Sequence, residues 1–259
     1  MNADTLKHIV IAGGGSAGWM TAAMLASQLQ GNVNITLVES DDIGTIGVGE
    51  ATIPPIKRFN TMLGIDENEF LKRCNGSIKL GIQFENWGAV GERYFHQFGR
   101  FGTDFDYIPF PYFYLKARLE GLTTPIEQFS AAWQLASRNK FVPPNNDPRS
   151  LFSGYDYAYH FDAGRYARFL RDYATARGVV RTEGKIASVQ QHAHNGFIAQ
   201  LQLDDGRVIS GDFFIDCTGL RSLLLGQTLG VGFVDWSHYL LNDRAVAMQT
   251  SADPTLQRD

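Results

Sequence analysis

A glycine-rich turn near the amino terminus is the feature that most constrains the fold of this chain. The turn at 13–18 (Gly-Gly-Gly-Ser-Ala-Gly) follows an apolar run at 8–12 and opens a second apolar stretch at Trp19. In such a strand–turn–helix unit, the glycines permit a tight turn, backbone approach to a pyrophosphate, and close packing of helix on strand. The N–H groups at the helix start then face the phosphates. The residues predicted to contact a nucleotide here are Gly13, Gly15, Ser16, Ala17 and Gly18.

An acidic residue at the end of the next strand indicates which nucleotide binds. The apolar run at 33–38 predicts a second strand, and Glu39 follows it, 21 residues past Gly18. At this spacing a carboxylate accepts hydrogen bonds from a ribose 2′-OH and repels a 2′-phosphate. The pattern therefore favours an adenine dinucleotide such as FAD or NAD over NADP. The alternative is an ordinary βαβ unit with Glu39 on a solvated strand end.

The composition limits the remaining possibilities. A chain of 259 residues with 44% hydrophobic residues suits one large globular domain or two small ones. The net charge of −4 and the lack of a long Lys/Arg run argue against nucleic acid as a partner. Polar residues and glycines interrupt the uncharged stretch 9–38, which predicts neither a membrane span nor a signal peptide. Cys74 and Cys217 fit no metal or redox spacing, so we expect reduced thiols, no metal and a cytoplasmic location.

The first third of the chain is predicted to form short strands and helices in alternation. We expect a strand at 7–12, a helix at 16–29, and a loop from Asp41 to Pro55. Two short helices follow, with Asp66 as the N-cap of the second. Alternating apolar residues predict one continuous strand over 77–87, which carries Lys79. The short helices are placed at 56–63 and 67–74.

The residues after 100 are predicted to form further strands and one long helix. The aromatic-rich segment 101–114 contains two prolines and suggests an irregular loop. A strand with alternating aromatics at 155–161 leads to Asp162, the expected cap of a helix at 163–177 that Gly178 ends. Residues 179–216 read as one β-meander with Asn-Gly and Asp-Gly hairpin turns. The tryptophans expected in the core are Trp19, Trp87, Trp133 and Trp236.

The last predicted strand ends at an acidic residue that is also a candidate for nucleotide binding. The apolar residues 213–215 are followed by Asp216 and then by Gly219. The carboxyl ends of parallel strands converge on the ligand crevice of a doubly wound sheet. Asp216 is therefore predicted to bond a polar cofactor group; the alternative is that it caps the turn that follows. The fold class predicted is α/β: a Rossmann-like fold that binds FAD or another adenine dinucleotide, with an added β-meander and irregular aromatic-rich insertions.

Several segments together resemble one family, the flavin-dependent halogenases of the tryptophan halogenase type. The resemblance covers essentially the whole chain. The segments that carry it are GGGSAGW at 13–19, GVGEATIP at 47–54, IKLGIQFENW at 78–87, YHFDA at 159–163 and DCTG at 216–219.

The resemblance implies a two-component enzyme. A separate flavin reductase would supply reduced FAD, and dioxygen would add at flavin C4a to give a hydroperoxide. A halide ion, chloride or bromide, would attack the hydroperoxide to form hypohalous acid, which Lys79 would capture for transfer to a small electron-rich aromatic such as tryptophan or indole. The segment 47–54 would lie beside the flavin ring. The further cofactor-binding residues implied are Gly49, Glu50, Ala51, Thr52, Asp216 and Gly219.

The surroundings of Lys79 give independent support for a reactive amine. Apolar residues alternate around it, and desolvation lowers the pKa of a lysine, so that more of the amine is neutral and nucleophilic. The alternative is a lysine on the wet face of an edge strand. The lack of a second GxGxxG turn also favours an external source of reduced flavin.

The sequence departs from the family pattern in its second half. The chain has no WxWxIP signature, and it ends at Asp259 before a counterpart of the later glutamate and the halide-binding loop. We therefore expect residues 1–259 to form the FAD-binding module without the C-terminal substrate and halide half. Two other functions stay open: an FAD-dependent monooxygenase or hydroxylase, and an inactive FAD-binding fragment.

Overall fold

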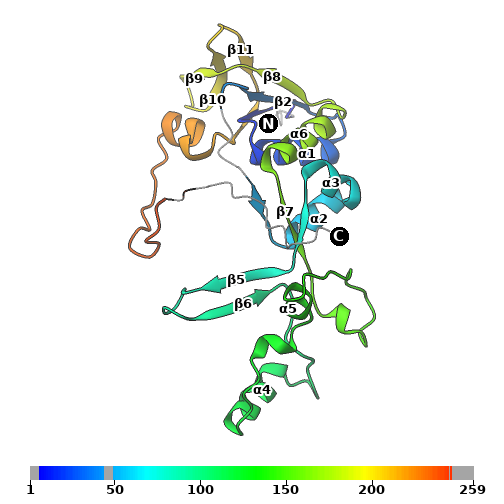
Figure 1. The fold of residues 1–259 in the computed structure, drawn as a ribbon. Coiled ribbons are helices and arrows are strands. Elements are labelled where there is room, and N and C mark those ends of the chain that lie inside the picture. Colours follow the sequence, from blue (N-terminus) through cyan, green and yellow to red (C-terminus); the bar gives the residue numbers. More distant parts are fainter. Residues whose placement is uncertain (1–5, 44–48, 245, 247–259) are drawn as a thin grey trace. The chain divides into compact units, whose positions relative to one another are not determined.

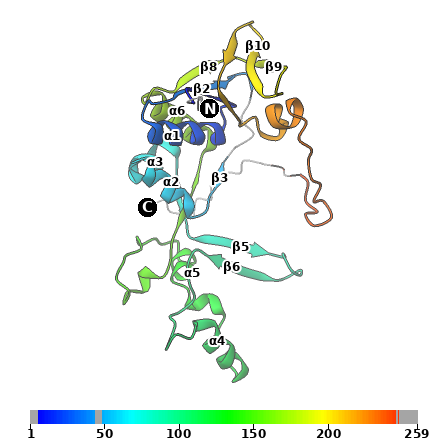
Figure 2. The ribbon, with the colours of Figure 1, turned by 180° about the vertical axis from the view of Figure 1, so that it is seen from behind.

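The computed structural model describes residues 6–43, 49–244 and 246, which divide into two compact units (Figures 1 and 2). Each unit is described by itself. Among the described residues, the first comprises 6–43, 49–50, 63–75, 161–244 and 246, and the second comprises 51–62 and 76–160. Within the described residues, no helix has the length and apolar character needed to cross a membrane.

The first unit is built on a four-stranded parallel sheet in the order β12-β1-β2-β8. Val10 and Leu37 lie on its two central strands and are fully buried, as their unbroken apolar runs predict. Helix α1 (Ser16–Leu29) connects β1 to β2 and packs against α6 (Ala163–Thr175). The Rossmann-like parallel sheet is thereby confirmed. The strands are β1 (His8–Ala12), β2 (Asn34–Glu39), β8 (Val180–Glu183) and β12 (Phe213–Asp216).

The expected meander over 179–216 is too long. Only β9 (Ile186–Gln191), β10 (Ile198–Leu203) and β11 (Val208–Ser210) form an antiparallel sheet. The predicted hairpin turns join them, and Gly196 and Gly206 both adopt positive φ. Strands β8 and β12 belong instead to the parallel sheet, because they pair with β2 and β1. No local signal separates a strand that pairs along the chain from one that pairs with a distant segment.

Side-chain caps begin two helices of the first unit, α3 and α6, as the sequence predicts. The Asp66 carboxylate accepts a hydrogen bond from the Glu69 N–H at the start of α3 (Glu67–Cys74). The Asp162 carboxylate does the same for the Arg165 N–H at the start of α6. These caps satisfy N–H groups that a helix leaves without an internal partner.

The second unit contains two small sheets. One has the strand order β3-β7-β4, and the other is the hairpin of β5 with β6. The predicted single strand over 77–87 is wrong, because Leu80 separates β4 from β5 and the two strands pair in different sheets. The elements are β3 (Glu50–Ala51), α2 (Pro55–Met62), β4 (Ser77–Lys79), β5 (Gly81–Glu85), β6 (Arg93–Gln97), α5 (Ala131–Ala136) and β7 (Ala158–Phe161).

Other predictions for the second unit also need correction. The segment 101–114 is only partly irregular, since helix α4 (Phe110–Leu119) begins within it. Its two prolines lie at the cap and in the first turn, where the missing N–H costs no helical hydrogen bond. Trp87 is 69% exposed rather than in the core, and it packs edge-to-face on Phe84. Among the other tryptophans, Trp19 is buried as predicted, Trp133 is half-buried and Trp236 is 60% exposed.

Candidate functional site

The glycine turn of the first unit is packed so closely that three of its glycines, Gly13, Gly14 and Gly18, have no room for a side chain. Gly13 has φ +106°, and a Cβ on it would lie 2.2 Å from the Cys217 carbonyl oxygen. A Cβ on Gly18 would lie 1.9 Å from the Gly13 carbonyl oxygen. The Gly13 N–H donates to the Val38 carbonyl oxygen at 2.8 Å, which ties the turn to β2. The turn therefore holds a fixed shape at the start of α1.

The N-terminus of α1 is open toward an anion. Gly15 is its N-cap, and no side chain caps the helix. Its first turn contains no acidic residue, and a Cβ on Gly15 would meet no atom within 4 Å. The first N–H groups of a helix have no internal acceptor and carry partial positive charge. The residues present therefore fit a pyrophosphate, and Ser16 and Ala17 stand in this first turn.

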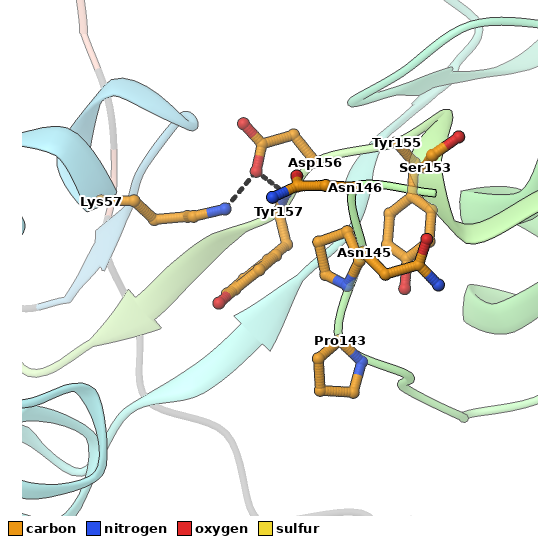
Figure 3. Close-up of a pocket in the computed structure, with 9 residues that line it drawn as sticks. Lys57, Pro143, Asn145, Asn146, Ser153, Tyr155, Asp156 and Tyr157 are labelled. Atoms are coloured by element: carbon orange, nitrogen blue, oxygen red, sulfur yellow. Dashed lines mark hydrogen bonds and ion pairs between the residues drawn. The ribbon is translucent and has the colours of Figure 1, made fainter. Parts of the chain in front are cut away.

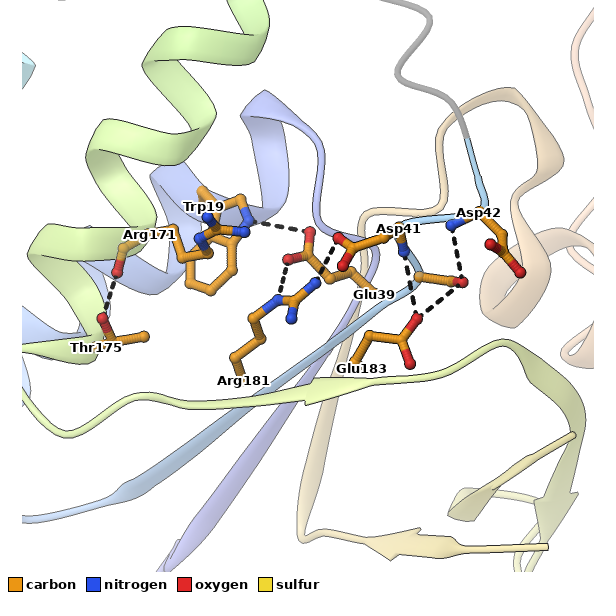
Figure 4. Close-up of polar contacts among 9 residues, drawn as sticks. Trp19, Glu39, Asp41, Asp42, Arg171, Thr175, Arg181 and Glu183 are labelled. Atoms are coloured by element: carbon orange, nitrogen blue, oxygen red, sulfur yellow. Dashed lines mark hydrogen bonds and ion pairs between the residues drawn. The ribbon is translucent and has the colours of Figure 1, made fainter. Parts of the chain in front are cut away.

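Glu39 is held at the glycine turn by two donors (Figure 4). The Arg181 Nε donates to Glu39 Oε1 at 2.6 Å, and the Trp19 Nε1 donates to Oε2 at 3.2 Å. A Cβ on Gly14 would overlap Glu39 Oε2 at 1.6 Å, so this glycine leaves the space that the carboxylate fills. The Glu39 side chain is only 13% exposed, which rules out the solvated strand end. Its contact with a ribose stays a prediction.

Asp216 stabilises the turn after β12. Its Oδ1 accepts from the Thr218 N–H at 3.0 Å, and its Oδ2 accepts from the N–H groups of Leu224 and Leu225 at 2.8 and 2.9 Å. Burial opposes its ionisation, but the hydrogen bond from the Thr218 hydroxyl at 2.6 Å, together with these N–H bonds, outweighs burial and lowers the pKa of Asp216. This is the capping role that was left open from the sequence. Contact of Asp216 or Gly219 with a cofactor stays a prediction.

Lys79 in the second unit is a buried amine. It ends β4, an edge strand, and is only 7% exposed, so it does not lie on the wet face that the alternative required. Its Nζ donates to the Thr52 carbonyl oxygen at 2.9 Å and lies 5.5 Å from the centre of the Phe98 ring. Among the described residues, no carboxylate forms an ion pair with it. Burial lowers the pKa of Lys79.

Thr52, which accepts the hydrogen bond from Lys79, is itself held to β7 by hydrogen bonds to Tyr159. Its N–H and its hydroxyl both donate to the Tyr159 carbonyl oxygen, at 3.0 and 2.9 Å. The Tyr159 N–H in turn donates to the Thr52 hydroxyl oxygen at 3.1 Å. The sequence predicted Thr52 only as a flavin-loop residue and missed its contact with Lys79. No local signal links two residues that are 27 positions apart.

The remaining predicted residues of the flavin loop flank β7. A Cβ on Gly49 would lie 3.7 Å from the Phe161 carbonyl oxygen, and Glu50 and Ala51 form β3. Gly47 and Val48, which the resemblance places in the same loop, lie outside the described residues. The first unit thus contains the glycine turn, Glu39 and Asp216, and the second contains Thr52 and Lys79.

The second unit also has a pocket of about 380 Å³ that no sequence pattern predicts (Figure 3). The Lys57 ammonium forms an ion pair with Asp156 and lies 3.7 Å from the centre of the Tyr157 ring. The one cation and one anion of this lining neutralise each other, so the pocket offers no net charge to a ligand. The lining residues are Lys57, Pro143, Pro144, Asn145, Asn146, Ser153, Tyr155, Asp156 and Tyr157.

The parallel sheet, the open helix start and the glycine turn define a protein of the Rossmann-like α/β class. Comparison with known families makes the assignment more specific. The pattern of the family described as tryptophan halogenase matches residues 8–258. The chain belongs to the tryptophan halogenase family.

Individual relatives agree with this assignment. The chain is 39% identical to the tryptophan 7-halogenase RebH of Lentzea aerocolonigenes, over 96% of this chain and 49% of that protein. It is 37% identical to the tryptophan 6-halogenase ThaL of Streptomyces albogriseolus, with the same two coverages. The chain spans about half the length of these curated relatives.

Solved structures share the fold. BrvH, a flavin-dependent halogenase from Brevundimonas sp. BAL3, superimposes with a TM-score of 0.85 at 42% identity. The superposition covers 91% of this chain and 47% of the BrvH chain. Xcc4156, a flavin-dependent halogenase from Xanthomonas campestris, gives a TM-score of 0.84 at 49% identity, over 91% of this chain and 46% of its own.

Proposed function

We propose that this chain binds FAD and provides the flavin and lysine parts of a halogenase acting on an electron-rich aromatic such as tryptophan or indole. The observation that carries the proposal is the buried amine of Lys79, held by the Thr52 carbonyl and without an ion-pair partner among the described residues. A separate flavin reductase delivers FAD in its reduced form, and chloride or bromide is the second substrate. The similarity to the tryptophan 7-halogenase RebH and the tryptophan 6-halogenase ThaL supports an aromatic substrate of the tryptophan type.

The first unit supplies the dinucleotide site. The N–H groups at the start of α1 bind the pyrophosphate, and Glu39 accepts from the adenosine ribose. Gly49, Glu50, Ala51 and Thr52 line the flavin ring in this proposal, as the family resemblance implies. When bound and reduced, FAD supplies the reaction with dioxygen that oxidises the halide.

Lys79 holds the oxidised halogen. An ammonium donates a hydrogen bond to hypohalous acid and polarises it. A neutral amine instead attacks the halogen, so that an N–halogen bond forms, the halogen–oxygen bond breaks, and the amine proton leaves with hydroxide as water. The lowered pKa of Lys79 increases the neutral fraction at a given pH. Either form keeps the electrophile at one place for attack by an aromatic ring.

The test compares Lys79→Ala with the wild-type chain, each supplied with FAD, a flavin reductase, NADH, bromide and tryptophan or indole. We expect halide incorporation, measured by mass spectrometry, to fall by at least about a hundredfold, as for loss of a positioned reactive group. Flavin reoxidation by oxygen should continue at the wild-type rate. Lys116→Ala is the matched control, because that lysine is 75% exposed on α4.

The same experiment separates the other functions. A hydroxylase would oxygenate the aromatic and be indifferent to both bromide and Lys79→Ala. A wild-type chain that binds FAD but forms no product from any aromatic would favour the inactive FAD-binding fragment and count against the halogenase proposal.

A further inference from the structure

Glu39 is surrounded by a network of charged and polar side chains (Figure 4). No sequence pattern gives this network a role in dinucleotide binding. Arg181 stands on β8, one strand away from Glu39 on β2. Its Nε donates to Glu39 Oε1 at 2.6 Å, and its second guanidinium arm donates to Asp41 Oδ1 at 2.6 Å. Arg181 therefore joins two carboxylates, of which Glu39 is nearly buried and Asp41 is 72% exposed. These charge-assisted bonds are short and directional.

Within this network, the Glu39 carboxylate keeps free positions for accepting further hydrogen bonds. An ionised carboxylate has about four acceptor positions. Arg181 takes one on Oε1 and Trp19 takes one on Oε2, so each oxygen retains acceptor capacity. A ribose presents its 2′- and 3′-hydroxyls as two adjacent donors, which matches one acceptor on each oxygen. With the Gly14 backbone against Oε2, the carboxylate has little freedom to turn away.

The charge around Arg181 decides what else this site accepts. Glu39 and Asp41 more than neutralise the single guanidinium. Nearby, the Ser40 hydroxyl donates to Glu183 at 3.2 Å, and Lys185 pairs with Asp42 at 2.8 Å. The cluster thus contains four carboxylates and two cations and has a formal charge of −2. Such surroundings repel a dianionic 2′-phosphate, although an arginine alone would attract one.

We propose that Arg181 is the positioning residue that fixes Glu39 as the acceptor for the adenosine ribose, and that Asp41 neutralises Arg181 so that this subsite rejects a 2′-phosphate. The proposal rests on the proposed binding of FAD by the first unit. It assigns no contact between Arg181 and the flavin ring, so its effect is confined to the adenosine end of the cofactor.

The first test measures the dissociation constants of FAD and FMN by flavin fluorescence for the full chain and Arg181→Gln. FMN has no adenosine, so only FAD should respond. We expect FAD to bind about tenfold more weakly, the equivalent of one charge-assisted hydrogen bond, and FMN to bind as in the wild type. Arg181→Lys should fall between, since an ammonium cannot reach both carboxylates with a planar fork. Equal FAD affinity, or an equal loss for FAD and FMN, would overturn the role of Arg181.

The matched control is Arg73→Gln, which removes another 2.6 Å arginine–aspartate pair of the same unit, between α3 and α6. Its FAD affinity should equal that of the wild type. A wild-type chain that binds neither flavin would overturn the proposed function itself, which separates that failure from a failure of the Arg181 assignment.

The second test uses Asp41→Ala, whose exposed side chain can be removed with little effect on folding. The probes are 5′-ADP and adenosine 2′,5′-bisphosphate, as competitors of FAD. The wild type should prefer 5′-ADP, and Asp41→Ala should reduce that preference about tenfold, because the second arm of Arg181 becomes free to bind the 2′-phosphate. An unchanged preference would overturn the role of Asp41.

Discussion

Glu39 in the first unit and Lys79 in the second are both nearly buried charged groups, but their surroundings differ in kind. Glu39 receives a guanidinium and an indole N–H. Lys79 donates one hydrogen bond to a backbone carbonyl and lies over the face of the Phe98 ring, with no ion pair among the described residues. A buried charge beside an opposite charge is held in one orientation, whereas the burial of Lys79 without such a partner removes hydration and lowers its pKa. The first arrangement suits recognition, and the second suits reactivity.

Removal of the Glu39 carboxylate should give the largest loss of stability. Glu39→Ala leaves the Trp19 N–H without its acceptor in a buried position and leaves Arg181 with only the exposed Asp41. We expect the free energy of unfolding to fall by about 2 kcal/mol. Urea denaturation followed by tryptophan fluorescence measures it. Glu39→Gln, which keeps an acceptor oxygen, should lose less, and equal losses in both variants would contradict the importance of the paired charge.

The contact between Thr52 and Lys79 should be detectable in the reactivity of the amine. Thr52→Val keeps the shape of the side chain but removes the hydroxyl that bonds Tyr159, so the carbonyl that holds Lys79 is less fixed. We expect halide incorporation to fall about tenfold, and Thr52→Ser to restore most of it. The independent readout is the pH profile of Lys79 modification by trinitrobenzenesulfonate, located by mass spectrometry. A profile identical to the wild type would show that Thr52 supports the fold alone.

The smallest expected effect tests the cost of burying Lys79. Lys79→Met should raise the free energy of unfolding at pH 7 by about 1 kcal/mol, because methionine needs no hydration. The pKa of Lys79 is lower in the folded state, so between that value and its ordinary value of 10.5 the unfolded chain binds more protons. Wild-type stability should therefore rise with pH across this window, and the advantage of Lys79→Met should shrink toward pH 10.5. Urea titrations at several pH values would contradict the lowered pKa if the difference stayed constant.

The elements that the sequence predicted correctly have their causes within a few residues. The apolar run of β1, the glycine turn, and the caps Asp66 and Asp162 each act on their neighbours, so their pattern is visible locally. Lys79 was found through its family motif, and its burial agrees with the apolar alternation around it. The prediction of one strand over 77–87 was wrong because strand propensity does not show that β4 and β5 take different partners.

The amino-acid sequence by itself determined the dinucleotide-binding turn, the family and the lysine, since glycine conformation, apolar periodicity and motif spacing are properties of short segments. Only the tertiary structure decided which groups surround the charges. It brought Arg181 to Glu39 across 142 positions and Thr52 to Lys79 across 27. The physical reason is that ion pairing and desolvation depend on distance in space, which strand pairing sets and the order of residues along the chain does not reveal.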